Sequence, residues 1–429
     1  MTMQVGVGFL GAGTVGGALL DRLINESKAI SAKTGLELVV RAVAVRDLKK
    51  TRILDIPPDL LTDQPAAVVD RPDVDIVVEV LGGLQPAGDL VLRALESAKP
   101  VVTANKELVA ARGHELIAAA ESSGVSLLFE AAVGGGIPII RPLSESLAGE
   151  RISSVIGIVN GTTNYILTKM VEEGSDYADA LAEAQALGYA ESDPTADVGG
   201  ADAAAKCAIL ASLAFGTWVG SDQVHREGID QLDRADFRFA ADLGYTPKLL
   251  AIAEDTGAGI SVRVHPALVP LDHPLASVRG ATNAIFVSGP SIGDLLFTGP
   301  GAGGDATATA MLGDVIVAAR EILAGTRVTS RIRFAPGQVL PFSESTTKWY
   351  LRLVVKDQPG VLAEVASAFG KHDVSIKSVW QDGSGDEVTL ILVTHDAKEG
   401  DLQAASDTLR SLEVVTDVAS VLRVHSDEP

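Results

Sequence analysis

The hydrophobic pattern of the first 136 residues alternates between short strands and helices. Short apolar runs rich in β-branched residues are typical of strands that are buried on both faces of a sheet. The expected strands cover 5–10, 38–45, 74–81, 101–106 and 126–130, and helices are expected over 17–25 and 88–97. Strands that alternate with helices in this way predict a doubly wound α/β domain.

A different pattern begins near residue 150. Residues 151–160 alternate as a strand that ends in a polar turn, and further strands are expected at 263–264 and 284–287. The helix that contains 203–216 is apolar on nearly every face, which is typical of a buried helix. We therefore expect an α+β domain in which helices cover one face of a mixed sheet. A long apolar helix over 306–324 is expected to return to the first domain, and 326–347, without a clear period, resembles a linker.

The last part of the chain has the order βαββαβ. Strands are expected at 350–356, 376–381, 387–394 and 414–424, with helices at 360–371 and 402–412. This order is typical of a split ferredoxin-like unit.

Composition limits the class of protein. At 429 residues, the chain has room for two to four domains of roughly 100–200 residues each. The formal charge of −21 argues against nucleic-acid and anionic-membrane partners, which need a basic surface. No apolar run reaches the roughly 18 residues of a membrane span, and the N-terminus lacks the features of a signal peptide. The single cysteine, Cys207, fits a reducing compartment, so we expect a cytoplasmic protein.

A glycine-rich turn directly follows the first expected strand. It consists of Gly11, Ala12, Gly13, Thr14, Val15 and Gly16, with a helix after it. Strand, GxGxxG and helix in this order favour a dinucleotide site, because the glycines let a pyrophosphate approach the backbone and the helix N-terminus stabilises its charge. The motif alone has many false positives, and a tight strand-to-helix turn is the alternative.

The second expected strand ends at Arg46, with Lys49 and Lys50 nearby. Enzymes that prefer NAD usually carry an acid at such a strand end, whereas a basic residue suits the 2′-phosphate of NADP. Asp47 blurs this distinction because it could take the acidic role. We expect NADP to be preferred over NAD, against the alternative of a solvated basic turn.

Two further segments follow strands of the same domain. Lys106 ends the strand expected at 101–106, and the carboxyl ends of parallel strands face the ligand crevice; the alternative is a lysine that caps a strand at the surface. Glu130 precedes three consecutive glycines, 134–136. Their backbone carbonyls could turn toward one point and hold a hard cation in oxygen ligands, although a flexible crossover explains these residues equally well.

Acidic residues and one lysine crowd the segment before the buried helix. They are Glu191, Asp193, Asp197, Asp202 and Lys206. Asp202 and Lys206 are four residues apart and share a helical face. Most pairs of this spacing are solvated and contribute little, but this helix is apolar and buried charges are costly unless paired or used. The segment therefore predicts a carboxylate-lined pocket closed by one lysine.

Two helix starts offer anion-friendly backbone. The turn 160–164, which contains Thr162, could hold a substrate carboxylate with its N–H groups and hydroxyls, or it is an ordinary helix cap. The glycine-rich segment 299–305, which contains Gly303, precedes the long apolar helix in the same way.

The acidic segment closely resembles the signature of the homoserine dehydrogenase family. The matching residues are Ala184, Gly188, Tyr189, Ala190, Asp193, Pro194, Asp197, Val198, Gly200, Asp202 and Lys206. The resemblance covers nearly the whole chain. It implies reversible hydride transfer between NAD(P)H and L-aspartate 4-semialdehyde, which gives L-homoserine, in a form without a kinase extension.

The resemblance also implies roles for single residues. Lys206 would donate the proton and Lys106 could share the relay, while Glu191 and Asp202 would hold the substrate ammonium. Tyr189, Thr162 and Asp197 would line the pocket. The nucleotide would be reached by Arg46, Lys106, Gly188 and Gly303, in addition to the glycine turn. A sodium-type cation would be bound by Glu130, Val133, Gly135 and Ile137, the last three through carbonyls.

The C-terminal segment strongly resembles an ACT domain, including Asp357, Pro359 and Gly360 at its first strand–helix turn. Such domains bind small effectors, usually amino acids, at paired interfaces, so feedback inhibition by threonine and a homodimer or homotetramer are expected. A purely structural dimerisation module is the alternative. The expected domains are 1–136 for NAD(P), completed by 305–330, then 137–304 for catalysis and dimerisation, a linker over 331–347, and ACT over 348–425.

Two other functions fit the sequence less well. A phosphorylating semialdehyde dehydrogenase requires an exposed cysteine nucleophile, and Cys207 lies inside an apolar helix where a core cysteine is expected. A non-catalytic amino-acid sensor would leave the acidic signature and Lys106 without a purpose.

Overall fold

The computed structural model describes residues 4–52, 54–325, 327–328 and 332–425. It divides into two compact units, which are treated separately below. The first unit comprises Met1–Val155, Ala208–Ser221 and Asn283–Gly337, and the second comprises Ile156–Cys207, Asp222–Thr282 and Gln338–Pro429. Parts of the expected linker, including Arg331, lie outside the described residues.

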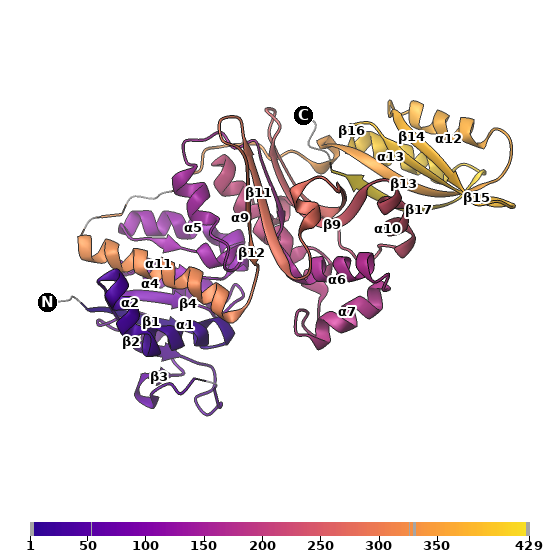
Figure 1. Ribbon diagram of the computed structural model, residues 1–429. Helices are drawn as coiled ribbons and strands as arrows, with labels where there is room; N and C mark the ends of the chain where they lie inside the picture. The colour runs from indigo at the N-terminus through magenta and orange to yellow at the C-terminus, as the bar shows by residue number, and fades with distance from the viewer. Residues whose placement is uncertain (1–3, 53, 326, 329–331, 426–429) are drawn as a thin grey trace. The chain divides into compact units, whose positions relative to one another are not determined.

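The first unit contains a six-stranded parallel sheet in the order β3-β2-β1-β4-β5-β6 (Figure 1). This is the strand order of a dinucleotide-binding fold, and the expected doubly wound domain is confirmed. Its elements are β1 (Gln4–Leu10), α1 (Thr14–Asn25), α2 (Ser27–Thr34), β2 (Glu37–Ala44), β3 (Leu61–Thr62), α3 (Pro65–Asp70), β4 (Ile76–Glu79), α4 (Ala87–Glu96), β5 (Val101–Thr103), α5 (Lys106–Ser123) and β6 (Leu127–Leu128).

The long apolar helix α11 (Gly304–Ala324) packs into the core of this sheet, as expected. Met311, Leu312 and Val315 are buried in one cluster with Val7 and Phe9 of β1. Helix α11 lies beside α1 (Figure 1). The strands β11 (Thr282–Gly289) and β12 (Gly293–Pro300) lead into this helix.

The structure corrects several expected boundaries. The strand expected at 101–106 ends at Thr103, and Lys106 is instead the first residue of α5, because the side chain of Asn105 accepts from the Leu108 N–H and caps the helix. Helix α1 begins at Thr14 rather than at residue 17. The strand expected to run to residue 130 ends at Leu128, and Glu130 begins a single 3₁₀ turn.

The second unit contains most of the mixed sheet. Its strands follow the order β7-β9-β10-β17-β13-β15-β14. Before the C-terminal segment its elements are β7 (Ser154–Ile158) from Ile156 on, α6 (Gly161–Glu172), α7 (Tyr177–Ala186), α8 (Thr195–Val198), α9 (Ala201–Phe215) as far as Cys207, β8 (His225–Arg226), α10 (Arg234–Asp242), β9 (Tyr245–Asp255) and β10 (Ile260–Pro270). Strands β9 and β10 are antiparallel along their whole length.

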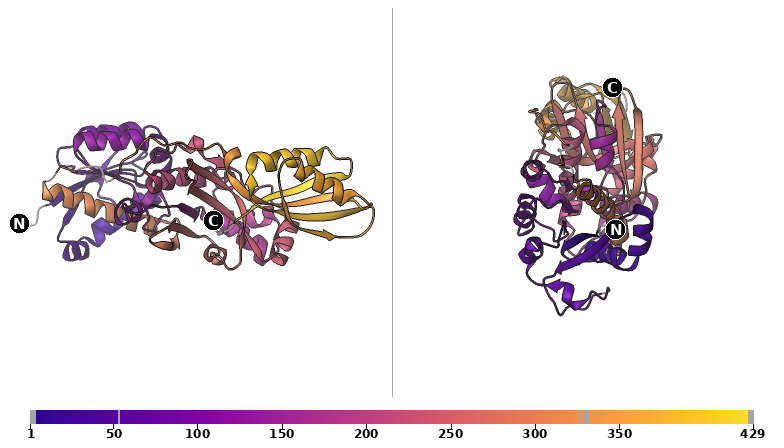
Figure 2. Two further views of the ribbon diagram at one scale, coloured as in Figure 1. Left: turned by 90° about the horizontal axis from the view of Figure 1, so that it is seen from above. Right: turned by 90° about the vertical axis from the view of Figure 1, so that its left-hand side faces the viewer.

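The C-terminal segment folds as the expected βαββαβ unit. It comprises β13 (Thr346–Lys356), α12 (Val361–Gly370), β14 (Ile376–Asp382), β15 (Glu387–Thr394), β16 (Ala397–Lys398), α13 (Glu399–Arg410) and β17 (Val415–Val424). Figure 2 shows both helices on one side of its antiparallel strands. Its edge strand β17 pairs in parallel with β10, Ala267 opposite Arg423. The sheets of the two segments are therefore continuous, which the sequence did not indicate.

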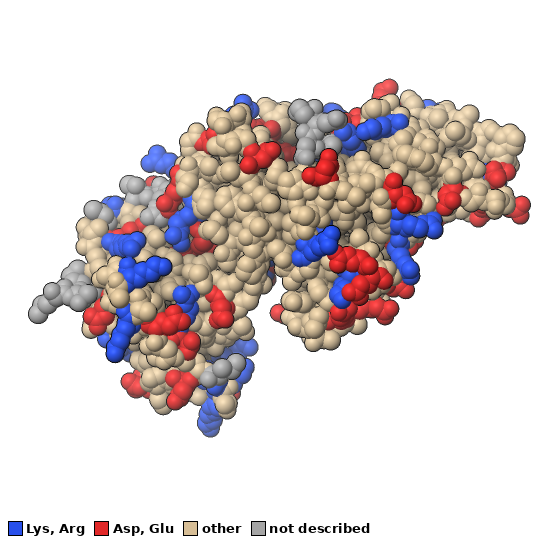
Figure 3. All heavy atoms as spheres, viewed as in Figure 1, with Lys and Arg blue, Asp and Glu red and all other residues tan. Residues whose placement is uncertain are grey.

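On the face drawn in Figure 3, basic and acidic side chains are interspersed. Within the described residues, no helix is long and apolar enough to cross a membrane.

A buried ion pair links α10 to β13. Asp236 is fully buried, and its Oδ1 accepts from Arg352 Nε at 2.7 Å and from the Tyr350 hydroxyl at 3.2 Å. Asp233 also accepts from Arg352, at 2.7 Å. Removing the buried acceptor would leave a largely buried guanidinium without its main counterion.

We predict that Asp236→Ala lowers the free energy of unfolding by about 3–5 kcal/mol, because Arg352 loses its buried counterion and keeps only the exposed Asp233. Denaturant unfolding of the full chain measures this. The control is Asp382→Ala, since Asp382 pairs with Arg238 at 3.3 Å while both side chains are exposed, and such pairs contribute less than about 1 kcal/mol. Equal losses in both variants would contradict the role assigned to Asp236.

Candidate active site

The acidic segment and the helix after it bring Asp202 and Lys206 together in the second unit. Both lie in the first two turns of α9 and are buried, with 7% and 9% of their surface exposed. The backbone enters this helix through Gly200, whose φ of +78° is left-handed and whose Cβ position lies 3.2 Å from the Glu227 carbonyl. A side chain there would be strained. The expected burial of the charged first turns is confirmed.

The ammonium of Lys206 is held from two sides. Its Nζ donates to Asp202 Oδ2 and to the carbonyl oxygen of Val159, both at 2.7 Å. An ammonium has three hydrogens. Two are therefore used within the described residues, and the third can serve a ligand.

Asn160 connects two of the acids in the signature, Asp197 and Asp202. Its Nδ2 donates to Asp202 Oδ2 at 2.8 Å and to Asp197 Oδ1 at 2.7 Å. Its Oδ1 accepts from the Thr163 N–H at 2.8 Å and so caps α6. One side chain thereby fixes the start of a helix and the spacing of two carboxylates.

The loop between α7 and α8 is more open. Tyr189 is 47% exposed, and its carbonyl accepts from the Thr162 hydroxyl at 2.6 Å. Glu191 is exposed as well. Asp193 accepts from the Thr195 hydroxyl and N–H, and these bonds hold its pKa below the ordinary value. Asp193 thus stabilises the start of α8, while Glu191 remains open to solvent.

Cys207 is a core residue. It is 1% exposed, and burial raises the pKa of its thiol to about 12. A reactive cysteine needs an accessible thiolate, so Cys207 does not fit a nucleophile.

The glycine turn of the first unit is shaped for close approach. Gly11 has φ +111°, and its Cβ position lies 2.8 Å from the Val80 carbonyl, which excludes a side chain. Gly13 is exposed, has no atom near its Cβ position, and immediately precedes α1 as an N-cap that makes no side-chain hydrogen bond. The open backbone at a helix start is suited to a phosphate.

A buried carboxyl organises the strand ends beside this turn. Glu79 ends β4, and burial raises its pKa. It accepts from the Thr103 hydroxyl at 2.5 Å and from the Leu81 N–H at 2.8 Å. The Thr103 hydroxyl in turn accepts from the Asn105 N–H at 3.0 Å. This chain of bonds fixes the start of α5, where half-buried Lys106 lies.

Arg46 is exposed just beyond β2. The carboxylate of the neighbouring Asp47 accepts from the Lys49 N–H at 2.8 Å, which closes a local turn. Gly188 and Gly303 both have positive φ, of +76° and +114°, and Gly303 begins α11.

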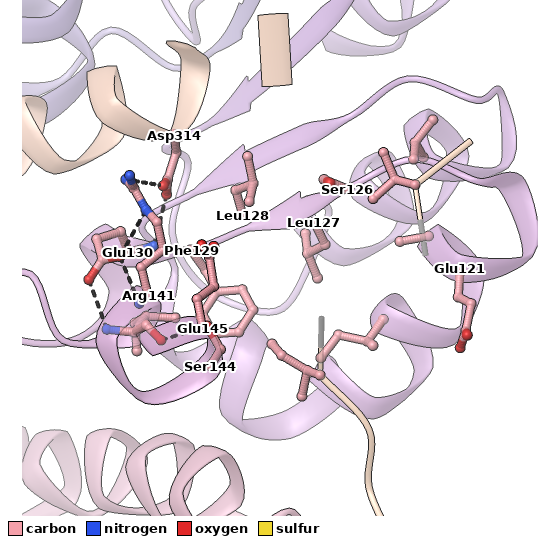
Figure 4. A pocket seen from close by; sticks show the side chains of 16 residues that line it. Glu121, Ser126, Leu127, Leu128, Phe129, Glu130, Arg141, Ser144, Glu145 and Asp314 are labelled. Atoms are coloured by element: carbon pink, nitrogen blue, oxygen red, sulfur yellow. Dashed lines mark hydrogen bonds and ion pairs between the residues drawn. The ribbon is translucent and has the colours of Figure 1, made fainter. Parts of the chain in front are cut away.

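Glu130, which precedes the three glycines in the chain, is buried and lies beside Arg141 and Asp314 (Figure 4). Its Oε1 accepts from the N–H groups of Ile139 and Ile140, at 2.6 and 2.8 Å, and its Oε2 from that of Arg141 at 3.0 Å. Its own N–H donates to Asp314, whose pKa burial raises to about 7. Both oxygens of the Glu130 carboxylate are therefore engaged in hydrogen bonds with backbone N–H groups.

Carbonyl oxygens are the groups that this loop offers to a cation. Gly134 and Gly135 are consecutive left-handed residues, with φ of +71° and +57°. The Gly134 carbonyl accepts from the Ile137 N–H and closes a turn. The side chain of Asn283, buried nearby against Gly301, has no partner for its amide within the described residues. Oxygen ligands of this kind fit a hard cation better than a transition metal.

Sequence reasoning missed the residues that position the site. Asn160, Glu79 and Thr103 act through bonds to groups distant in the chain, and Asn105 acts by capping α5. For Asn160 the only local signal was its place before a helix, which is also typical of an ordinary cap. Within the described residues, no three His, Cys, Asp or Glu side chains gather as a metal-binding group.

The comparisons with known proteins agree with this architecture. Residues 138–316 match the model of the homoserine dehydrogenase family, residues 11–130 match its NAD-binding domain, and residues 349–414 match the ACT domain.

Relatives that align with this chain over nearly their whole length are named homoserine dehydrogenase. Homoserine dehydrogenase of Corynebacterium glutamicum is 48% identical, with 99% of this chain and 96% of that protein covered. That of Mycobacterium tuberculosis is 49% identical, covering 98% and 97%. A crystal structure of a homoserine dehydrogenase from Thiobacillus denitrificans aligns with a TM-score of 0.94 at 42% identity, covering 99% of both chains. The chain belongs to the homoserine dehydrogenase family.

Proposed function

We propose that the chain catalyses the reversible NAD(P)-dependent reduction of L-aspartate 4-semialdehyde to L-homoserine. The observation that carries this proposal is the buried Lys206 ammonium, which Asp202 and the Val159 carbonyl hold by two of its hydrogens. A carbonyl that becomes an alkoxide needs a proton donor beside it. The bound nucleotide supplies the hydride, and Lys206 supplies the proton.

Neighbouring residues would recognise the substrate. Asp202 and the exposed Glu191 are the carboxylates proposed to hold its ammonium. Asp197 is bound to the same Asn160 amide as Asp202, so we keep it as a pocket residue. Tyr189 and Thr162 would line the pocket side by side, because the Thr162 hydroxyl donates to the Tyr189 carbonyl. Lys106 remains a candidate for sharing the proton relay.

For the nucleotide we propose NADP over NAD. The glycine turn from Gly11 to Gly16 would hold the pyrophosphate, with Gly188 and Gly303 near the rest of the nucleotide. Exposed Arg46 would bind the 2′-phosphate, and the carboxylate of Asp47 is engaged by the Lys49 N–H. A hyperthermophilic archaeal homoserine dehydrogenase solved with NADPH aligns with a TM-score of 0.61 at 29% identity, covering 74% of this chain and 98% of that chain.

We also propose a monovalent cation, Na⁺, at the three-glycine loop. Because the Glu130 carboxylate is bonded to three backbone N–H groups, Glu130 would contribute its carbonyl, as would Val133, Gly135 and Ile137. The cation would stiffen the loop and take no part in the proton transfer.

Regulation and assembly complete the proposal. The ACT segment would sense an amino-acid effector, with threonine the first to test, at the exposed turn formed by Asp357, Pro359 and Gly360. We propose a homodimer or homotetramer in the cytoplasm. We propose an NAD(P)-binding domain over 1–136, completed by 305–330, a catalytic and dimerisation domain over 137–304, a linker over 331–347 and an ACT domain over 348–425. The burial of Cys207 argues against a phosphorylating semialdehyde dehydrogenase, which needs an exposed cysteine. A non-catalytic amino-acid sensor would not need the Asp202–Lys206 pair.

We predict that Lys206→Ala lowers kcat by about 10²–10⁴-fold, because the developing alkoxide loses its proton donor, while NADPH still binds. The decrease in NADPH absorbance in the presence of aspartate semialdehyde measures turnover, and fluorescence titration measures binding. Lys371→Ala removes an exposed lysine and serves as control. Near-normal turnover in Lys206→Ala would exclude this lysine as the donor.

We predict that Arg46→Ala weakens NADPH binding about tenfold or more and leaves NADH binding nearly unchanged, because only NADPH carries the 2′-phosphate that a guanidinium can bind in bidentate fashion. Equilibrium titration with both nucleotides measures this, with NADH as the internal control. Unchanged NADPH affinity, or equal losses for both nucleotides, would refute the assignment.

A further inference from the structure

A second polar pocket lies in the second unit, where the C-terminal strands join β9 and β10. Its volume is about 420 Å³, within the roughly 300–1,000 Å³ typical of small-molecule sites. Strands β9, β10, β13 and β17 and the residue Asp396 line it. None of the residues given a catalytic, nucleotide or cation role above lines this pocket, and neither does the turn at Asp357.

Two ion pairs dominate its charge. Arg263 Nη1 lies 2.7 Å from Glu254 Oε2, and Lys348 Nζ lies 3.3 Å from Asp396 Oδ2. In each pair the cation is deep and the acid lies toward the rim. The side chains of Arg263 and Lys348 are 6% and 7% exposed, whereas those of Glu254 and Asp396 are 33% and 53% exposed.

The other charged groups are already satisfied. Arg423 Nε and Nη2 each lie 3.2 Å from a carboxylate oxygen of Glu399, and its Nη1 donates to Glu227. The positive charge of Arg423 is therefore compensated by two acids that do not line the pocket. The remaining formal charges therefore belong to the two deep cations and their two rim acids, and the polar side chains of His265, Thr346, Thr347 and His425 also line the pocket.

His265 supplies an additional acceptor. Burial holds its pKa well below the usual range, so the ring is neutral. Its Nδ1 lies 2.9 Å from the Pro266 carbonyl oxygen. Because a carbonyl oxygen can only accept, the proton is on Nδ1 and Nε2 has a lone pair. Within the described residues, neither His265 Nε2 nor the Nε–H of Arg263 has a partner. One requires a donor and the other an acceptor.

Together, the four groups Arg263, Glu254, Lys348 and Asp396 have no net charge. A simple anion would displace the rim acids and leave them unpaired, and a simple cation would do the same to the deep bases. We propose that this pocket binds a small zwitterionic amino acid, with its carboxylate toward Lys348 and Arg263 and its ammonium toward Glu254 and Asp396. Such a ligand inserts between the partners of both pairs and keeps every charge compensated.

Calorimetric titration of the full chain, without substrate or nucleotide, tests this assignment independently of the catalytic roles. The probes are L-alanine and β-alanine, with malonate and 1,3-diaminopropane as three-carbon ions of a single sign, at matched ionic strength. We expect saturable binding of at least one amino acid, at least tenfold tighter than that of either ion. Absence of saturable binding by both amino acids would overturn the proposal.

Two variants locate the ligand. Lys348→Met and Asp396→Asn should each weaken amino-acid binding about tenfold or more, and Asp396→Asn should also strengthen malonate binding several-fold, because the rim loses a negative charge. Lys398→Met is the control, since Lys398 pairs with Glu344 at 2.9 Å on the surface. Asp396 is more than half exposed, so its variant will test the site even if Lys348→Met misfolds. Amino-acid binding that survives Asp396→Asn unchanged would place the ligand elsewhere and contradict the proposal.

Discussion

A lysine and an aspartate one helical turn apart, both withdrawn from water, are the constraint on which the second unit depends. Burying such a pair carries a desolvation penalty that can exceed the free energy gained from the attraction between the two charges. A buried ion pair is therefore weak evidence for a contribution to stability, and a role in function is the better explanation for it. Lys206 and Asp202 are retained inside α9, where the surrounding residues are almost all apolar.

The surroundings of the pair show how the fold maintains it. Asn160 is bonded to Asp202 and Asp197 and at the same time caps α6. The left-handed conformation of Gly200 lets the acidic loop turn into α9. In the first unit, Glu79 has a comparable place, because its bonds fix the strand ends that precede Lys106. Each positioning residue is buried and polar, and each serves more than one partner.

Much of this could be predicted from sequence. Local hydrophobic periodicity can be read directly from the sequence. It predicts the strand–glycine–helix order, the buried helix with charges in its first turns and the βαββαβ order. The partners of Asn160 could not be predicted, because its amide bonds to acids far along the chain. The parallel pairing of β10 with β17 was equally hidden, since no local pattern specifies which edge strands meet. Lys106 was misplaced because an Asn cap and a strand end both follow a short apolar run.

A double-mutant cycle on kcat/KM tests most directly whether Asp202 and Lys206 act as one unit. It compares the parent enzyme with Asp202→Asn, Lys206→Met and the double variant, using NADPH and aspartate semialdehyde. Groups that act together show strongly non-additive losses. The account predicts that the double variant is about as active as Lys206→Met alone. Losses that multiply independently would contradict it.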